Sequence, residues 1–193
     1  MSFLPIYNCY HPILKQKTLP IEEIDGSIKK LVDDMFETMY KADGLGLAGN
    51  QVGEKKSLFI VDASQVEEGK GKYAPMVIIN PEIISFSDED IEYREGCLSI
   101  PTFYDHVIRP KNIQLRYFDL DQKENIIEAD DILSRVIQHE YDHLNGVLFF
   151  ERLTPVKRTL AKSKLRKIQK GQILSDYDMI GADGKFLKKD NSK

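Results

Sequence analysis

Two histidines and a glutamate in the last third of the sequence have the spacing of a metal site. His139, Glu140 and His143 form an HExxH motif within residues 139–143. Side chains four residues apart lie on one face of an α-helix, so both histidines can bind one metal ion while Glu140 projects beside it. Two histidines on a partly buried helix face are the alternative without a metal. The spaced pair with a glutamate between them favours metal binding.

A catalytic metal commonly has three protein ligands and one position for water, so this motif lacks one ligand. Peptidases with the motif take the third ligand from downstream, but no histidine follows His143. Upstream, Cys97 lies in the segment EGCLS, where Gly96 lets the backbone approach closely. A thiolate is a strong metal ligand, whereas a lone cysteine is more often a small buried side chain. Cys97 is therefore a candidate ligand, alongside the downstream acidic residues Glu151, Asp176, Asp178, Asp183 and Asp190.

A glycine-rich segment at residues 44–53 contains Gly44, Gly46 and Gly49 in the pattern GxGxxG. That pattern binds dinucleotides only where it follows a strand and opens a helix. Here a helix is expected before it, and residues 50–53 do not start one. We therefore reject nucleotide binding and expect the glycines to expose backbone N–H and C=O groups to a ligand, with Gln51 as a nearby amide donor.

Composition narrows the class of protein. The 193 residues suit one domain spanning 1–193, and 41% apolar with 30% charged residues is typical of a globular protein. The net charge of −4 gives no reason to expect nucleic-acid binding. No apolar run approaches the roughly 20 residues of a membrane span, and the first 20 residues do not resemble a signal peptide. Together with Cys9 and Cys97 as two reduced thiols, this predicts a cytoplasmic protein without a membrane partner.

Several elements must position these residues. An apolar stripe predicts a helix over 25–42 with Asp25 as its N-cap, and a second helix runs from Asp130 or Asp131 to Gly146. A third follows Pro155 to about residue 170, and the polar tail from 183 to 193 is expected to fray. Strands are expected at 57–62, 75–80, 83–94, 113–118 and 126–129. Because strands and helices do not alternate regularly, the pattern predicts an α+β fold.

Three segments in order resemble the bacterial-type peptide deformylases, whose motifs are GxGLAAxQ, EGCLS and QHExDH. This chain has GLGLAGNQ at 44–51, EGCLS at 95–99 and QHEYDH at 138–143, and the likeness covers most of the chain. The resemblance implies antiparallel sheets around the helix that carries the histidines. It also implies a hydrolase that removes the formyl group from the N-terminal formylmethionine of nascent polypeptides.

The resemblance also assigns roles. Cys97, His139 and His143 would hold one divalent metal, with Fe²⁺ expected, although Zn²⁺, Ni²⁺ or Co²⁺ suit the same ligands. Glu140 would transfer protons, and the Gln51 side chain and the Leu98 N–H would stabilise the oxyanion. The remaining residues implied by the resemblance are Leu45, Gly46 and Gly96 along the substrate backbone, Arg135 and Val136 at the methionine pocket, and Arg109 paired with Asp142.

Three positions depart from the family pattern. Gly49 replaces an alanine, which predicts a looser loop. Tyr104 replaces an arginine near the substrate. Arg135 replaces an aliphatic residue, and we expect its stem to line the methionine pocket while its charge reaches water. The last two changes leave the substrate side-chain preference open.

The helix after Pro155 is strongly basic. Its charge predicts either a solvated face or a surface that docks on the ribosome. Two other functions remain as alternatives: an HExxH metallopeptidase, and an interaction module with a structural metal, which would need a fourth protein ligand. The basic residues are Lys157, Arg158, Lys162, Lys164, Arg166, Lys167 and Lys170.

Overall fold

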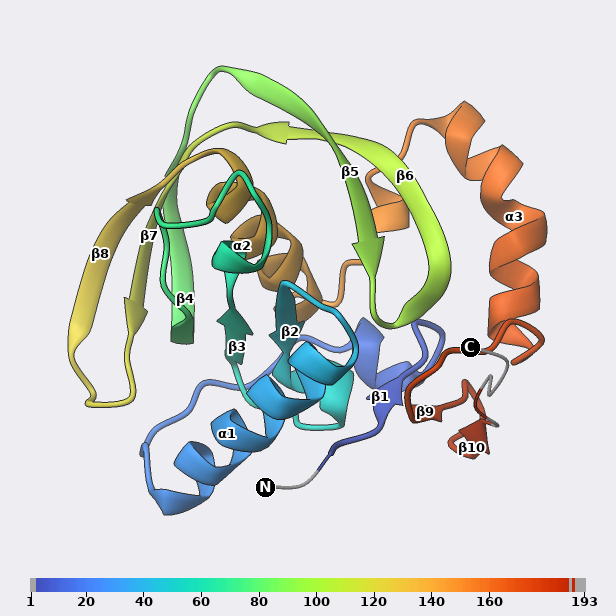
Figure 1. Cartoon of the computed structure of the whole chain (residues 1–193), viewed down its shortest axis with the longest axis horizontal. Helices are drawn as coiled ribbons and strands as arrows, with labels where there is room; N and C mark the ends of the chain where they lie inside the picture. The colour runs from blue at the N-terminus through green and yellow to red at the C-terminus, as the bar shows by residue number, and fades with distance from the viewer. Residues whose placement is uncertain (1–2, 188, 190–193) are drawn as a thin grey trace.

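A computed structural model describes residues 3–187 and residue 189 of the chain, so part of the predicted polar tail lies outside the described residues. The fold contains three helices and three sheets among these residues, which confirms the α+β prediction (Figure 1). The five-stranded sheet is antiparallel and has the order β2-β3-β4-β7-β8. Its strands are β2 (Gly46–Ala48), β3 (Leu58–Val61), β4 (Met76–Phe86), β7 (Ile113–Phe118) and β8 (Glu124–Ala129).

Strand β3 is buried on both faces, which explains its uninterrupted apolar sequence LFIV. Leu58 and Ile60 belong to the cluster that α1 covers, whereas Phe59 and Val61 belong to the cluster that α2 covers. The alternation of side chains along the strand thus gives each helix its own half of the core.

Helix α1 (Gly26–Lys41) begins as predicted, because the Asp25 carboxylate accepts hydrogen bonds from the backbone N–H groups of Ser27 and Ile28. Its buried side chains pack against β2 and β3 and leave the opposite face to solvent. The helix therefore supports the glycine-rich segment that follows it.

Helix α2 (Asp131–Leu144) carries the HExxH motif, and all its residues except Asp131 and Tyr141 are buried. Ile132, Leu133, Val136 and Ile137 pack against the five-stranded sheet. The helix ends at Leu144, and Gly146, whose φ is +73°, continues the chain in a left-handed turn. A buried helix of this kind holds its side chains in fixed directions.

Strands β5 (Asp90–Cys97) and β6 (Ile100–Pro110) form a separate two-stranded sheet that arches over the molecule (Figure 1). The sequence predicted one extended segment at 83–94; the structure divides it, because the chain reverses at residues 87–89 between β4 and β5. Strand β6 was not predicted. Its exposure alternates from Thr102 to Arg109, but Arg109 is buried while Tyr104 and Ile108 are exposed, so its sequence does not alternate between apolar and polar residues.

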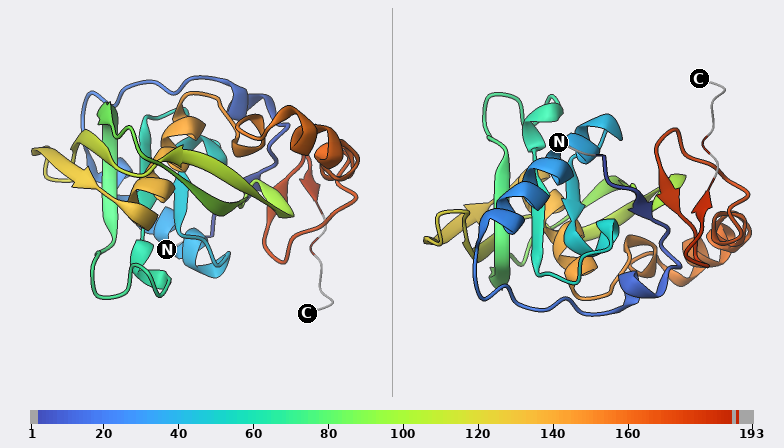
Figure 2. Two further views of the ribbon diagram at one scale, coloured as in Figure 1. Left: turned by 90° about the horizontal axis from the view of Figure 1, so that it is seen from above. Right: turned by 90° about the horizontal axis from the view of Figure 1, so that it is seen from below.

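The two chain ends meet in the third sheet. Strand β1 (Ile6–Tyr7) pairs in parallel with β9 (Met179–Ile180), and β9 pairs with β10 (Phe186–Leu187). Figure 2 shows this sheet beside α3 (Pro155–Gln169), at the end of the molecule opposite β8. The expectation that the tail frays from 183 is wrong for β10, which the partner strand holds. No helix among the described residues has the length and apolarity of a membrane span.

Candidate active site

The structure brings the two histidines and the upstream cysteine to one point. The His139 and His143 rings lie edge to face with centroids 5.0 Å apart on α2. Cys97, at the end of β5, places its Sγ 3.2 Å from Nε2 of His143. One atom from each of the three residues lies within 4.8 Å of the other two. No other group of three potential ligands was found among the described residues, so none of the downstream carboxylates there joins the cluster.

Glu95 fixes the orientation of His139. Its Oε2 lies 2.9 Å from Nδ1 of His139, which leaves Nε2 of that ring for a ligand. Arg109 donates to both carboxylate oxygens, at 2.8 Å and 3.1 Å. Burial raises the pKa of Glu95, but the hydrogen bonds from His139 and Arg109 outweigh this and hold that pKa well below its usual range. Glu95 is therefore a buried carboxylate that directs a histidine.

The charged network continues to the far side of α2. Arg109 Nη1 donates to Asp142 Oδ2 at 2.6 Å, which is the pairing that the resemblance implied. Arg152 also donates to Asp142, from Nε at 3.0 Å and from Nη2 at 2.5 Å. Because breaking a buried ion pair leaves an uncompensated charge, this network resists movement of the helix.

The structure contradicts the expected placement of the Arg135 charge. Its side chain is 4% exposed, and Nη1 donates to Glu95 Oε1 at 2.6 Å and to the Val107 carbonyl at 3.0 Å. Nη2 donates to the Ile91 carbonyl. The guanidinium does not reach water because a buried carboxylate and two carbonyls bind it inside the protein. Val136 is also buried and belongs to the core cluster under the sheet.

Glu140 is buried beside the three candidate ligands. Its Oε2 has no hydrogen-bond partner among the described residues, and burial raises its pKa to about 7. A Cβ at Gly46 would lie 2.6 Å from Oε1 of Glu140, so only glycine leaves room for this carboxylate. An unpartnered buried carboxylate beside one thiol and two imidazoles fits a three-ligand metal with a bound water.

Gln51 faces the cysteine from the glycine-rich segment. Its Oε1 accepts from the Ala48 N–H at 2.8 Å, and its Nε2 lies 3.2 Å from Ser99 Oγ and 3.6 Å from Cys97 Sγ. The backbone contact fixes the amide with its nitrogen toward the cluster. Residues 49–52 form a short 3₁₀ turn, which was not predicted but is too short to be the helix that a nucleotide site needs.

The expectation of a looser loop at Gly49 is wrong. A Cβ there would lie 2.9 Å from the Lys56 carbonyl oxygen and 3.4 Å from the Leu58 carbonyl oxygen. The glycine instead permits a close backbone approach, which holds the segment tightly against the start of β3.

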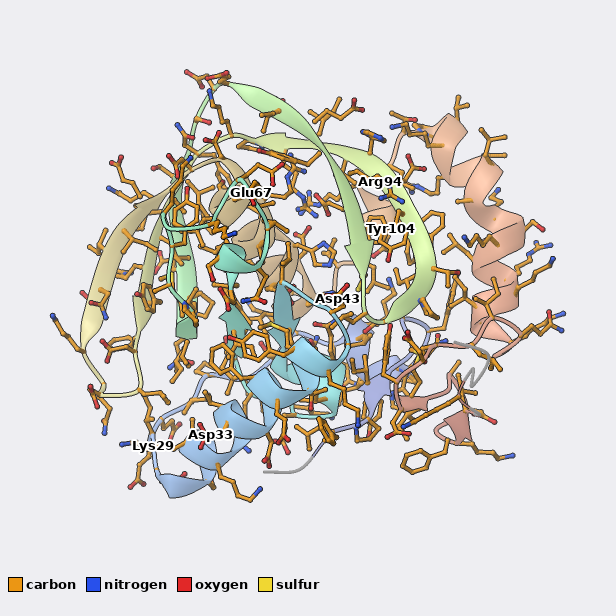
Figure 3. All side chains as sticks on the ribbon, in the orientation of Figure 1. Lys29, Asp33, Asp43, Glu67, Arg94 and Tyr104 are labelled. Carbon is orange, nitrogen blue, oxygen red and sulfur yellow. The ribbon has the colours of Figure 1, made fainter. Side chains whose placement is uncertain are left out.

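The two strand edges nearest the cluster have no strand partner among the described residues: β2 pairs only with β3, and β5 only with β6. Leu45 and Gly46 lie at the first edge, and Gly96 at the second. Tyr104 lies against Gly96, where a Cβ would meet its ring at 2.4 Å, and it remains 55% exposed. The Arg94 guanidinium lies 4.4 Å from the centroid of the Tyr104 ring, and Figure 3 shows the two side chains together.

Sequence reasoning missed three supports of the site. It assigned no role to Glu95 beyond its place in the motif. It did not find Asn50, whose Nδ2 donates to the His143 carbonyl at 2.5 Å, or Tyr177, whose hydroxyl donates to the Leu98 carbonyl at 2.6 Å. These contacts join residues that lie 93 and 79 positions apart, so no local pattern could reveal them.

Comparisons with known proteins find relatives over most of the chain. The chain matches the polypeptide deformylase family over residues 3–159. A peptide deformylase of Bartonella henselae is 45% identical over 86% of this chain and 93% of its own length. One of Salinibacter ruber is 42% identical over 93% of this chain and 95% of its own. The crystal structure of the Ehrlichia chaffeensis enzyme in complex with actinonin has a TM-score of 0.79 and 42% identity, and covers 86% of this chain and 98% of that one.

The family match spans most of the sequence, and its motifs meet at one buried cluster. The chain therefore belongs to the polypeptide deformylase family.

Proposed function

We propose that this protein removes the formyl group from the N-terminal formylmethionine of nascent polypeptides by a hydrolysis centred on Glu140 and the Cys97, His139 and His143 cluster. Membership of the family gives the reaction, in which water cleaves the formyl amide and releases formate. The observation that carries the assignment of residues is the convergence of three ligand atoms beside an unpartnered buried carboxylate.

Cys97, His139 and His143 are the residues that would hold the metal. A divalent ion held by these residues would supply Lewis acidity and would lower the pKa of a bound water toward about 7. We propose Fe²⁺ as the ion, as the family resemblance implies. A thiolate and two imidazoles can also bind Zn²⁺, Ni²⁺ or Co²⁺. The order of affinity among divalent first-row metals is similar for most sites of this kind, so these ligands alone do not select Fe²⁺.

Glu140 acts as the general base and then as the general acid. Buried beside the cluster, with Oε2 unpartnered among the described residues, it takes a proton from the attacking water and gives that proton to the leaving amine. Glu140 is 4% exposed, so bulk water has little access to this carboxylate. Proton transfer of this kind contributes about 10²–10⁴ to the rate.

Gln51 and Leu98 supply the two hydrogen-bond donors for the oxyanion. The Gln51 Nε2 faces Cys97 because its Oε1 is held by the Ala48 N–H. The Leu98 N–H follows Cys97 directly in the chain, in the turn between β5 and β6. Donors already in place at the developing charge need no reorganisation during the reaction.

The substrate backbone would add as a strand at the free edges of β2 and β5, near Leu45, Gly46 and Gly96. The stem of Arg135 and Val136 would lie at the methionine pocket, although the Arg135 charge belongs to the Glu95 pair. Tyr104, being exposed beside Gly96, is placed to contact residues after the methionine. We treat the whole chain as a single catalytic domain.

The test of this function is Glu140→Ala, assayed on a formyl-methionine peptide with the bound metal measured in the same sample. We expect the variant to keep its metal and to lose activity by about 10²–10⁴. Wild-type activity in a metal-loaded variant would remove Glu140 from the mechanism. Gln138→Ala is a neighbouring control, since Gln138 lies on the same helix but bonds to Ser134 and Pro110 instead.

We further propose that α3 docks on the ribosome, in keeping with a cytoplasmic location. Lys162 and Arg166 lie on α3 and Lys170 is its C-cap, at intervals of four residues, and no acidic partner is found for them among the described residues. Val156 and Leu160 on the same helix are 71% and 78% exposed. Ala161, Leu165 and Ile168 are buried instead and anchor the helix to the protein.

Charge reversal tests the docking surface without removing the helix. The triple variant Lys162→Glu, Arg166→Glu, Lys170→Glu should bind ribosomes more weakly at low salt and keep its activity on a short peptide. Lys29→Glu, Lys55→Glu, Lys72→Glu changes the same charge at other exposed positions and serves as the control. Equal ribosome binding by both triple variants would mean that α3 has only a solvated face.

A further inference from the structure

The turn between β5 and β6 contains only two residues, Leu98 and Ser99, and both oxyanion donors depend on it. Cys97 pairs with Ile100 across the turn, and the register shifts directly before this pair, between Gly96 and Cys97. Leu98 carries one proposed donor on its own backbone. Ser99 holds the other, because its Oγ lies 3.2 Å from Gln51 Nε2. Any movement of the turn would therefore displace both donors.

Groups from the two ends of the chain hold this turn. The Cys9 N–H donates to the Ser99 carbonyl at 2.9 Å. The Tyr177 hydroxyl donates to the Leu98 carbonyl at 2.6 Å, across 79 residues of sequence. Both carbonyls of the turn thus accept from outside the hairpin, and the Leu98 side chain lies close against Gly44 on the other side.

Tyr177 is itself held in place by the C-terminal segment. The Ser175 hydroxyl donates to the Tyr177 carbonyl at 2.7 Å, and the Ile6 N–H donates to the Asp178 carbonyl at 2.9 Å. Met179 then pairs with Ile6 in the parallel β1–β9 ladder. This segment lies after residue 159, where the match to the family ends. It nevertheless places a hydroxyl on the turn that follows the Cys97 ligand.

The hydrogen bond from Tyr177 is made to the central peptide of the turn, which is the peptide that rotates most readily. Common turn types differ mainly in ψ of the first central residue and φ of the second, which together rotate the peptide between them. In this turn that peptide joins the Leu98 carbonyl to the Ser99 N–H, whereas the Leu98 N–H belongs to the preceding peptide. Because the two peptides meet at the Leu98 Cα, a hydrogen bond to the Leu98 carbonyl also restrains the backbone that carries the Leu98 N–H. Neither Leu98 nor Ser99 has a positive φ.

We propose that Tyr177 is a positioning residue for the deformylation reaction: by holding the Leu98 carbonyl it restrains the backbone of the turn, and with it the Leu98 N–H and the Ser99 contact that aligns Gln51 Nε2 with the substrate oxyanion. The C-terminal segment is accordingly part of the catalytic apparatus of this chain. This inference rests on the proposed roles of Leu98 and Gln51.

The direct test is Tyr177→Phe, which removes the hydroxyl and keeps the packed ring. Removing an oxyanion donor outright costs roughly 10²–10³ in kcat, so misaligning the donors should cost less, about tenfold. We expect KM and bound metal to stay within about twofold of wild type, because the free strand edges and the three ligands remain. Hydrogen exchange at the Leu98 amide should become faster.

Tyr40→Phe is the matched control. The Tyr40 hydroxyl donates to Asp62 Oδ2 at 2.8 Å, so this variant loses one tyrosine hydrogen bond away from the turn. We expect its kcat and Leu98 exchange to match wild type. A Tyr177→Phe enzyme whose kcat equals that of Tyr40→Phe, or whose kcat falls only in proportion to lost metal, would overturn the inference. Activity of the wild type tests the proposed function separately, since the inference concerns the ratio between variant and wild type.

Discussion

The two halves of the candidate metal site are built in opposite ways. Helix α2 supplies His139 and His143 from positions one turn apart, and a buried network of Glu95, Arg109 and Asp142 surrounds them. The β5–β6 turn supplies Cys97 and depends on contacts from distant parts of the chain. The helix half is rigid through local geometry and buried charge, whereas the turn half is rigid only while its distant partners remain.

This difference predicts that substitutions around the turn affect catalysis first, and that substitutions around the helix affect stability first. Three changes, in order of decreasing expected effect, test that division.

Gln51→Ala should show the largest effect, and on catalysis. It removes a proposed oxyanion donor and the contact with Ser99, so kcat should fall by about 10²–10³ with bound metal retained. Steady-state kinetics with metal analysis on the same preparation measures this. A fall in kcat that follows metal loss would instead make Gln51 a support of the ligand Cys97.

Arg135→Met should mainly affect stability. The change removes one of two arginines that bind Glu95 and leaves two buried carbonyls without their donor, which costs about 1–3 kcal/mol in the free energy of unfolding. Unfolding in denaturant measures this loss in the free energy of unfolding. Arg166→Met, at an exposed position on α3, is the control and should change that free energy by less than about 0.5 kcal/mol. Equal effects would contradict the buried role of Arg135.

Gly49→Ala should show the smallest effect of the three. The added methyl would meet the Lys56 carbonyl at 2.9 Å, and relieving such overpacking costs about 1 kcal/mol or somewhat more. Thermal unfolding measures the loss. At Gly26 a Cβ has nothing within 4 Å, so Gly26→Ala should be neutral or slightly stabilising. A Gly49→Ala variant with the unfolding temperature of wild type would contradict the tight packing and support a loose loop.

The same division explains what the sequence could predict. Helix α2, its buried face and the pairing of histidines follow from a 3.6-residue period, and the Asp25 cap follows from local chemistry. The burial of the Arg135 charge could not be predicted in this way, because it depends on Glu95 of strand β5 lying opposite helix α2. The tight packing at Gly49 depends in the same way on the carbonyl of Lys56.

The missing third ligand of the HExxH motif and the family resemblance both indicated Cys97 as a ligand, but nothing in the sequence indicated what holds its turn. The contacts from Cys9 and Tyr177 arise from the meeting of the chain ends in the β1–β9 ladder. Such pairings are long-range tertiary features that one sequence does not encode in any local pattern. Strand β6 was missed for a related reason, since it buries Arg109 against Glu95 and Asp142 and exposes Tyr104 and Ile108.

The central claim is that the turn supplies the third ligand to a metal whose other two ligands lie on the helix. Co²⁺ binding tests it most directly, because a thiolate bound to Co²⁺ gives a charge-transfer absorption that imidazoles and carboxylates do not. We predict this band with one Co²⁺ per wild-type chain, its absence in Cys97→Ala, and its persistence in Cys9→Ala. Cobalt bound at the histidines with no such band in the wild type, or with an unchanged band in Cys97→Ala, would contradict the account.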